Sequence, residues 1–336
     1  MIIGTRDTDK QVLIVAELGN NHEGSMDTAV RLVKEAATAG VDAVKFQTYK
    51  TELFISRTDP ARYERLHSFQ LSFDEFRELS DIAHSLGLLF ISTPLDLESA
   101  LFLNDIVDAF KIASGDITFY PLLSMVAQTG KPIILSTGAS EPEQVDKAVS
   151  MIEKSWDDNN RSSDLALLHC VSCYPVPPDQ VNLGCIRTLS ERYPYTTGYS
   201  DHTSGIEASV LAVGCGARII EKHFTLDKLF SQFRDHQLSS DPNDLAELVR
   251  RVRFASSLIG KMPKRIQPCE SAIITAVTRS VAARIDMKKG HLIEMSDLMW
   301  IRPGGGLAPG DEFVLIGKKL KKEKSAGDQI NIKDIE

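Results

Sequence analysis

The chain has 336 residues, of which 43% are hydrophobic and 25% are charged. This is the composition of an ordinary soluble globular protein with room for one large domain and a small one. The formal net charge of -8 gives no indication of a nucleic-acid-binding surface. An anionic ligand would have to be held by locally placed Lys, Arg and backbone N–H groups, because the overall field repels it.

The first eleven residues contain no apolar run of signal-peptide length, and no later apolar run is long enough to cross a membrane. We therefore expect a cytoplasmic protein without a membrane partner. The five cysteines, an odd number, fit reduced thiols better than a disulfide framework. Cys170 and Cys173 form a CxxC, but no second pair accompanies them, so we interpret that spacing as incidental.

Short apolar runs, each typical of a buried parallel strand, recur along the first 224 residues. The predicted strands are 12–16, 43–46, 88–91, 109–112, 132–135, 165–168, 196–200 and 217–220. Helical segments follow them at about 25–39, 73–85, 97–103, 120–128, 141 onwards, 184–192, between the last two strands, and 241–258. Residues 49–72 are expected to form a long polar excursion.

Eight strand-then-helix units in strict alternation predict a (β/α)8 TIM barrel over residues 1–260 rather than a doubly wound open sheet. Beyond residue 260 the pattern changes. Residues 261–277 resemble a linker, and residues 278–336 contain short strands and turns, which indicates a compact second domain.

Polar side chains follow almost every predicted strand, where the loops of such a barrel converge on one mouth. They are Glu17, Lys45, Gln47, Ser92, Thr93, Ser114, Ser136, Thr137, His169, His202, Glu221 and His223. A barrel built only for stability does not need this ring, so we predict the active site there.

Two kinds of chemistry are indicated by these residues. Two imidazoles, His202 and His223, can share a divalent metal, although strand-end histidines also cap backbone groups. Lys45 and Lys111, with nearby hydroxyl groups, suit a phosphate, although a lysine here could instead pair with Glu17. The residues alone leave open whether a phosphorylated nucleophile attacks an aldehyde or a metal assists a hydrolysis.

Several ordered motifs resemble those of the sialic acid (N-acetylneuraminate) synthase family, which includes legionaminic and pseudaminic acid synthases. The matching segments are AELGNNHEG (16–24), VKFQT (44–48), FISTP (90–94), FKIASGD (110–116), LSTG (135–138), YSDHT (199–203) and EKHFT (221–225). Residues 279–335 resemble the antifreeze-like (SAF) domain of that family. The resemblance covers essentially the whole chain.

The resemblance implies a condensation of phosphoenolpyruvate with an N-acylamino hexose, giving a nonulosonic acid and phosphate with C–O cleavage. It implies Mn2+ or Mg2+ on His202 and His223, with Glu17 and Glu221 as catalytic residues. By the same resemblance, Lys45, Thr93, Lys111, Ser114 and Ser136 would bind phosphoenolpyruvate, and Gln47, Tyr174, Asp235 and Arg302 would bind the sugar. Family members form domain-swapped homodimers, so Arg302 would act in the partner's barrel.

Three departures from the family pattern lie on the sugar side: Asp116, Ser172 and the segment 233–239. They leave the phosphoenolpyruvate half of the interpretation intact and leave the hexosamine derivative open. The alternatives are a metal-dependent aldolase or hydrolase on the same barrel, acting on a phosphorylated sugar, and a sugar-binding protein without activity.

Overall fold

The computed structural model describes residues 1–260 and 263–336. Contacts between residues divide the chain into two compact units, Met1–Gly260 and Lys261–Glu336, and each is described by itself. Within the described residues, no helix combines the length and the apolar character that a membrane span requires.

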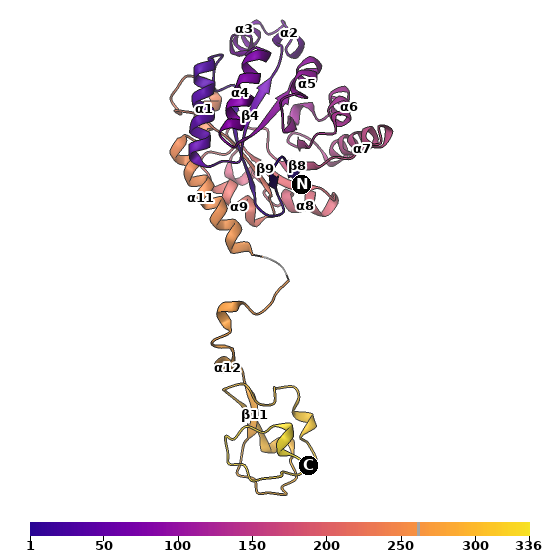
Figure 1. The fold of residues 1–336 in the computed structure, drawn as a ribbon, viewed down its shortest axis with the longest axis vertical. Coiled ribbons are helices and arrows are strands. Elements are labelled where there is room, and N and C mark those ends of the chain that lie inside the picture. The colour runs from indigo at the N-terminus through magenta and orange to yellow at the C-terminus, as the bar shows by residue number, and fades with distance from the viewer. Residues whose placement is uncertain (261–262) are drawn as a thin grey trace. The chain divides into compact units, whose positions relative to one another are not determined.

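The first unit is a closed barrel of eight parallel strands surrounded by helices (Figure 1), as the sequence predicts. Around the barrel the order is β10-β3-β4-β5-β6-β7-β8-β9. The strands are β3 (Leu13–Gly19), β4 (Ala43–Thr48), β5 (Leu89–Pro94), β6 (Ala109–Ile112), β7 (Ile133–Ser136), β8 (Leu165–His169), β9 (Thr196–Asp201) and β10 (Ile219–His223).

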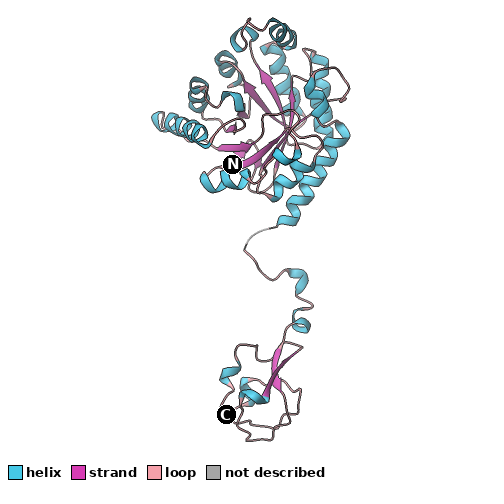
Figure 2. Ribbon diagram, turned by 180° about the vertical axis from the view of Figure 1, so that it is seen from behind, coloured by secondary structure: helices cyan, strands magenta, loops and turns pink. Residues whose placement is uncertain are grey.

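Helices follow the strands, and most of these helices form the outer layer of the barrel (Figure 2). They are α1 (Met26–Ala39), α2 (Thr51–Phe54), α3 (Pro60–Phe69), α4 (Phe73–Ser85), α5 (Leu97–Leu103), α6 (Tyr120–Thr129), α7 (Pro142–Asp158), α8 (Cys185–Arg192), α9 (Glu207–Gly214), α10 (Arg234–Leu238) and α11 (Pro242–Ile259). The expectation that residues 49–72 form a polar excursion is wrong in part, because α2 and α3 lie within this segment.

Local signals explain where these helices begin and end. The Ser25 side chain accepts a hydrogen bond from the Thr28 N–H at 3.2 Å and caps α1, which ends at Gly40 with a φ of 86°. Ser72 and Glu75 form a reciprocal capping box at the start of α4.

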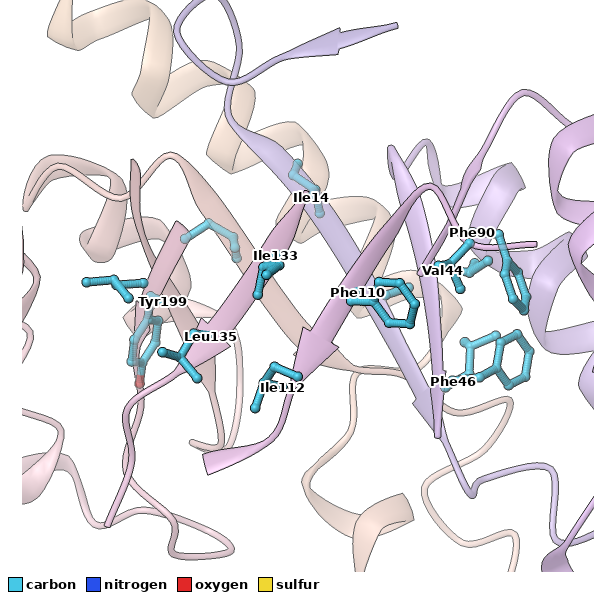
Figure 3. Packing of buried hydrophobic residues seen from close by; sticks show 14 of the residues in the cluster. Ile14, Val44, Phe46, Phe90, Phe110, Ile112, Ile133, Leu135 and Tyr199 are labelled. Carbon is cyan, nitrogen blue, oxygen red and sulfur yellow. The ribbon is translucent and has the colours of Figure 1, made fainter. Parts of the chain in front are cut away.

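Alternate residues of the strands face opposite sides of the barrel wall. The outward-facing side chains pack against the helices, and Figure 3 shows Phe46, Phe90 and Phe110 among them. The inward-facing apolar side chains form a separate core that also includes Met1 and Ile3. Ile3 belongs to β1 (Ile2–Ile3), which pairs with β2 (Arg6–Asp7). Polar side chains are therefore free to occupy the other end of the barrel interior.

The second unit contains α12 (Ile274–Val277), β11 (Ser280–Ala283) and β12 (Leu298–Ile301), the last two antiparallel. It has its own apolar core, which includes Val281, Ile293 and Leu315. Residues 261–262 of the predicted linker lie outside the described residues. The assignment of residues 278–336 to an antifreeze-like domain stays a prediction.

Candidate active site

Inward-facing positions at the carboxyl ends of the strands build the site. On β10, Ile219 belongs to the inner apolar core, and the next inward positions are Glu221 and His223. On β4, Ala43 is in the same core and is followed by Lys45 and Gln47. Each strand therefore places an apolar residue inside the barrel and polar residues at its mouth.

A cavity of about 1040 Å³ lies at this mouth. Every predicted site residue of the barrel lines it: Glu17, Lys45, Gln47, Thr93, Lys111, Ser114, Ser136, Tyr174, His202, Glu221, His223 and Asp235. Arg302 belongs to the second unit, so its predicted role in a partner's barrel stays a prediction.

Three members of the predicted ring do not line the cavity. Ser92 bonds to the hydroxyl of Thr48 at 2.8 Å, Thr137 donates to the carbonyl of Leu168, and a ring nitrogen of His169 bonds to the carbonyl of Val181. Each stands one residue away from an inward position, so its side chain points to the other side of the strand.

Two lysines and two carboxylates meet in the buried floor of the cavity. Lys45 Nζ lies 2.9 Å from Glu17 Oε2 and 3.4 Å from Glu221 Oε1, and it donates to the Thr93 hydroxyl at 3.3 Å. Lys111 Nζ lies 3.8 Å from Glu221 Oε1. Opposite charges at these distances stabilise one another strongly because water is excluded.

The two carboxyl groups differ in their acidity. Burial raises the pKa of Glu17, and the negative charge of Glu221 adds to this against the opposing Lys45 ammonium. Burial also acts on Glu221, but the charges of Lys111 and Lys45 outweigh it and hold the Glu221 pKa below its usual range. Pairs of carboxyl groups whose pKa values are pushed apart suit the roles of acid and base.

His202 and His223 present two neutral imidazoles with ring centres 5.5 Å apart. Burial lowers the pKa of both rings. His202 Nδ1 donates to the Val171 carbonyl at 2.8 Å, which leaves the Nε2 lone pair free. His223 Nδ1 is buried and has no hydrogen-bond partner among the described residues.

This histidine pair fits a divalent metal held by two protein ligands. Among residues 1–260 and 263–336, no group of three or more His, Cys, Asp or Glu side chains is arranged to hold a metal ion. The remaining ligands would therefore be water or substrate, as in a catalytic site with open positions.

Hydroxyl and backbone donors gather near Lys111. The Gly138 N–H donates to Ser114 Oγ at 3.0 Å, and Ser114 Oγ lies 3.0 Å from Cys170 Sγ. A Cβ at Gly138 would lie 2.7 Å from that sulfur, so this close approach requires glycine. Ser136 Oγ is buried without a partner among the described residues and can donate to a ligand.

The Tyr174 ring contacts both His202 and Arg234 at the edge of the cavity. The Tyr174 ring centre lies 4.2 Å from that of His202, and the Arg234 guanidinium lies over the same ring at 4.9 Å. Arg234 Nε lies 3.4 Å from Asp235 Oδ1. Burial raises the Asp235 pKa in spite of this cation.

The sequence-based prediction missed the cavity-lining residues of the 49–72 segment. They are Phe54, Arg62, Arg65, Leu66 and Phe69. The sequence did carry a signal for the start of α3. The Asp59 side chain accepts a hydrogen bond from the Arg62 N–H at 3.1 Å, and Pro60 is the first residue of the helix, a common pattern at helix starts.

Comparison with known proteins identifies the family. The sequence model of the NeuB family matches residues 32–264. The chain belongs to the NeuB family. This membership agrees with the resemblance found in the sequence motifs.

Relatives of this NeuB-family chain match over most of its length. An uncharacterized protein of Methanocaldococcus jannaschii is 44% identical over 99% of this chain and 98% of its own. The N,N'-diacetyllegionaminic acid synthase of Legionella pneumophila is 38% identical over 97% of this chain and 95% of its own. A crystal structure of N-acetylneuraminic acid synthetase from Leptospira borgpetersenii has a TM-score of 0.74 at 36% identity, covering 79% of this chain and 90% of that one.

Proposed function

We propose that this chain condenses phosphoenolpyruvate with an open-chain N-acylamino hexose to give a nonulosonic acid and inorganic phosphate. The observation that carries the proposal is the convergence of two lysines and two carboxyl groups beside a pair of neutral histidines. The names of the legionaminic and sialic acid synthases among the relatives support the same class of product.

Lys45 and Lys111 are proposed to bind the phosphate and carboxylate of phosphoenolpyruvate, with Thr93, Ser114 and Ser136 as hydroxyl donors. Ammonium groups supply charge, and hydroxyl groups supply direction. The free hydroxyl of Ser136 supports this assignment, because a buried donor without a partner is costly unless a ligand satisfies it.

Glu17 and Glu221 are proposed to move the protons. The enol carbon C3 attacks the aldehyde carbon, and the new hydroxyl group takes its proton from Glu17, whose raised pKa favours the acid form. Water adds at C2 and gives its proton to Glu221, whose lowered pKa favours the base form. Expulsion of phosphate then breaks the C2–O bond to the phosphoryl group, and the proton of the C2 hydroxyl leaves with the inorganic phosphate, so that a keto group remains at C2.

The sugar is assigned to Gln47, Tyr174 and Asp235, together with Arg302 of the partner subunit in a domain-swapped homodimer. Gln47 donates to Glu17 Oε1 at 3.2 Å, and this contact supports a sugar-binding role for its amide beside the proposed acid. His202 and His223 are proposed to hold Mn2+ or Mg2+, which would supply Lewis acidity to the aldehyde oxygen. The cytoplasmic location stays a prediction.

The test is to incubate the Mn2+-loaded protein with phosphoenolpyruvate and a series of N-acylamino hexoses, and to identify products by mass spectrometry. A nine-carbon keto acid that forms with one sugar, is lost on chelation, and is absent with folded His202→Ala supports the proposal. Phosphate release without any sugar would indicate a hydrolase instead. No turnover with any sugar would contradict the condensation.

A further inference from the structure

Two charged residues stand directly beside the histidines of the site but do not line its cavity. Asp201 precedes His202, and Lys222 precedes His223. Their side chains are completely buried, with 0% of each exposed, although charged groups are almost never fully buried unless they are paired. Stability alone does not explain such a pair, because well-packed apolar residues of similar volume often stabilise a core as well or better.

Asp201 and Lys222 lie opposite each other on neighbouring strands, where they are register partners in the pairing of β9 with β10. Tyr199 and Ile220 stand two residues before them and belong to the apolar core between the barrel and its helices. Both charged side chains therefore point into that outer layer as well. The histidines that follow them point to the opposite side of the barrel wall, into the cavity.

The ion pair joins the carboxyl ends of the two strands. Lys222 Nζ lies 3.3 Å from Asp201 Oδ2 and donates to the Thr203 carbonyl at 2.5 Å. Asp201 Oδ1 accepts from the backbone N–H and from the hydroxyl of Thr203, each at 2.8 Å. The Ser209 hydroxyl of α9 donates to Asp201 Oδ2 at 2.6 Å. These bonds hold the residues before and after His202 to β10 and to α9.

The backbone beside the other imidazole is held in a similar way. Lys222 precedes His223, and on its far side the Phe224 N–H donates to the Glu17 carbonyl at 2.8 Å. A metal site with two protein ligands takes its geometry from the strands that carry them. The separation of the two rings therefore depends on how firmly the ends of β9 and β10 are joined.

We propose that Asp201 and Lys222 are positioning residues of the histidine site, and that their ion pair holds His202 and His223 where both rings can bind one divalent metal. This inference rests on the metal site of the proposed function. Neither residue touches the metal or a substrate. Both act through the backbone of the histidines, and groups behind metal ligands commonly orient those ligands and tune metal affinity.

The experiment compares wild type with Lys222→Met, with Asp201→Asn/Lys222→Met and with the control Asp42→Asn. Lys222→Met leaves a buried carboxylate without its cation, and the double variant removes that charge too. Asp42 is a buried carboxylate at the amino end of β4, the other end of the barrel, where it pairs with Arg253 at 2.5 Å.

Metal affinity is measured in two ways on metal-free, folded protein. Titration with Co2+, which imidazole nitrogens also bind, is followed by the visible absorption of the ion, whose bands report its ligand geometry. Calorimetry gives the Kd for Mn2+. Urea unfolding of the same metal-free samples measures stability separately.

We expect the Kd for both metals to rise roughly tenfold in Lys222→Met and in the double variant, because both lose the link between the strand ends. The urea midpoint should fall in Lys222→Met and largely recover in the double variant, because no unpaired buried charge remains. Asp42→Asn should lower the urea midpoint and leave the Kd and the Co2+ spectrum unchanged. The double variant carries the test if Lys222→Met does not fold.

Three outcomes would overturn the inference and leave the metal site intact: a wild-type Kd in both variants, a Kd that recovers together with stability in the double variant, or an equal loss of affinity in Asp42→Asn. The last two would show that general destabilisation explains the effect. If wild type binds neither metal, or His202→Ala binds them as tightly as wild type, the metal assignment itself is wrong and the inference is wrong with it.

Discussion

Lys45 connects the two carboxyl groups that we assign to proton transfer. It lies within 3.4 Å of both Glu17 and Glu221, and all three side chains are almost completely buried. A buried carboxylate is expensive unless a cation compensates it, so these three residues form one electrostatic unit.

Lys45→Met should lower the free energy of unfolding of the barrel by about 3 kcal/mol, because it leaves two buried carboxylates without their shared cation. The double variant Lys45→Met/Glu17→Gln removes one of those charges and should recover about 1 kcal/mol or more. Urea unfolding followed by circular dichroism measures both values. Equal destabilisation by the single and double variants would show that the residues are not coupled.

Asp116 predicts a pH dependence of stability. Burial raises its pKa from 3.8 to about 6, although Lys111 opposes the shift. The folded state therefore binds the proton more tightly than the unfolded chain, and this contribution to stability is present below pH 4 and lost as the pH rises through 6.

Asp116→Asn removes the ionisable group and therefore the loss of stability that wild type shows as the pH rises. The variant should be more stable than wild type by about 1 kcal/mol at pH 7.5, after allowance for partial solvent screening. The difference should shrink towards zero as the pH falls to 4. Unfolding free energies across this pH range test the sign, and a constant difference would contradict the raised pKa.

Much of the candidate site was predictable residue by residue, because Glu17, Lys45 and His223 follow short apolar strands at inward positions. The side chain two residues beyond the last inward apolar position of a strand also faces inward. Applied to β5 and β7, this rule would have excluded Ser92 and Thr137 from the predicted cavity lining. Arg62 and Arg65 were missed for a different reason: they come from a helix, and strand-end reasoning does not reach them.

At the scale of elements, the loop between β3 and α1 is in backbone contact with α3. Glu23 has a φ of 47° and Gly24 a φ of 79°, so two successive residues adopt the left-handed conformation. A Cβ on Gly24 would lie 2.2 Å from the backbone oxygen of Ser68. This contact fixes α3, and with it Arg62 and Arg65, against the barrel mouth.

Gly24→Ala should therefore destabilise the barrel much more than Gly87→Ala. Both residues have a positive φ, but a Cβ on Gly87 would meet nothing within 4 Å. Gly87→Ala should cost about 1 kcal/mol for its backbone conformation alone, and Gly24→Ala at least about twice that because α3 must move. Similar losses in the two variants would contradict the contact.

Helices were predicted correctly where the hydrophobic period and the capping residues indicate the same bounds. The expected bounds of α4 and α5, 73–85 and 97–103, are those observed. α3 was missed because half of its sequence, PARYERLHSF, is charged or polar and Leu66 is its one buried residue, so the helix has no continuous apolar face. Its Asp-Pro start was the usable signal.

At the scale of the whole molecule, the sequence resemblance predicts that Arg302 completes the active site of a partner subunit. His202→Ala and Arg302→Ala should each be nearly inactive in isolation. In co-refolded mixtures, half of the dimers pair the two variants and contain one intact site, so about a quarter of wild-type activity should return. No recovery in mixed dimers of folded variants would contradict the swapped arrangement.

The order of the strands in the barrel could be predicted by counting the strand and helix units, because each unit is recognisable from its local sequence pattern. The histidines at two strand ends suggested a divalent metal, but local patterns could not name it, because its identity depends on a group outside the chain. Mn2+ or Mg2+ and the partner subunit entered only through the resemblance to the family.

The most direct test of the condensation follows the bridging oxygen of phosphoenolpyruvate. With that oxygen labelled as 18O and the acceptor sugar present, we predict that the label appears in inorganic phosphate by 31P NMR, because the C2–O bond breaks. Label that remains in the organic product would mean cleavage of the P–O bond and would contradict the account.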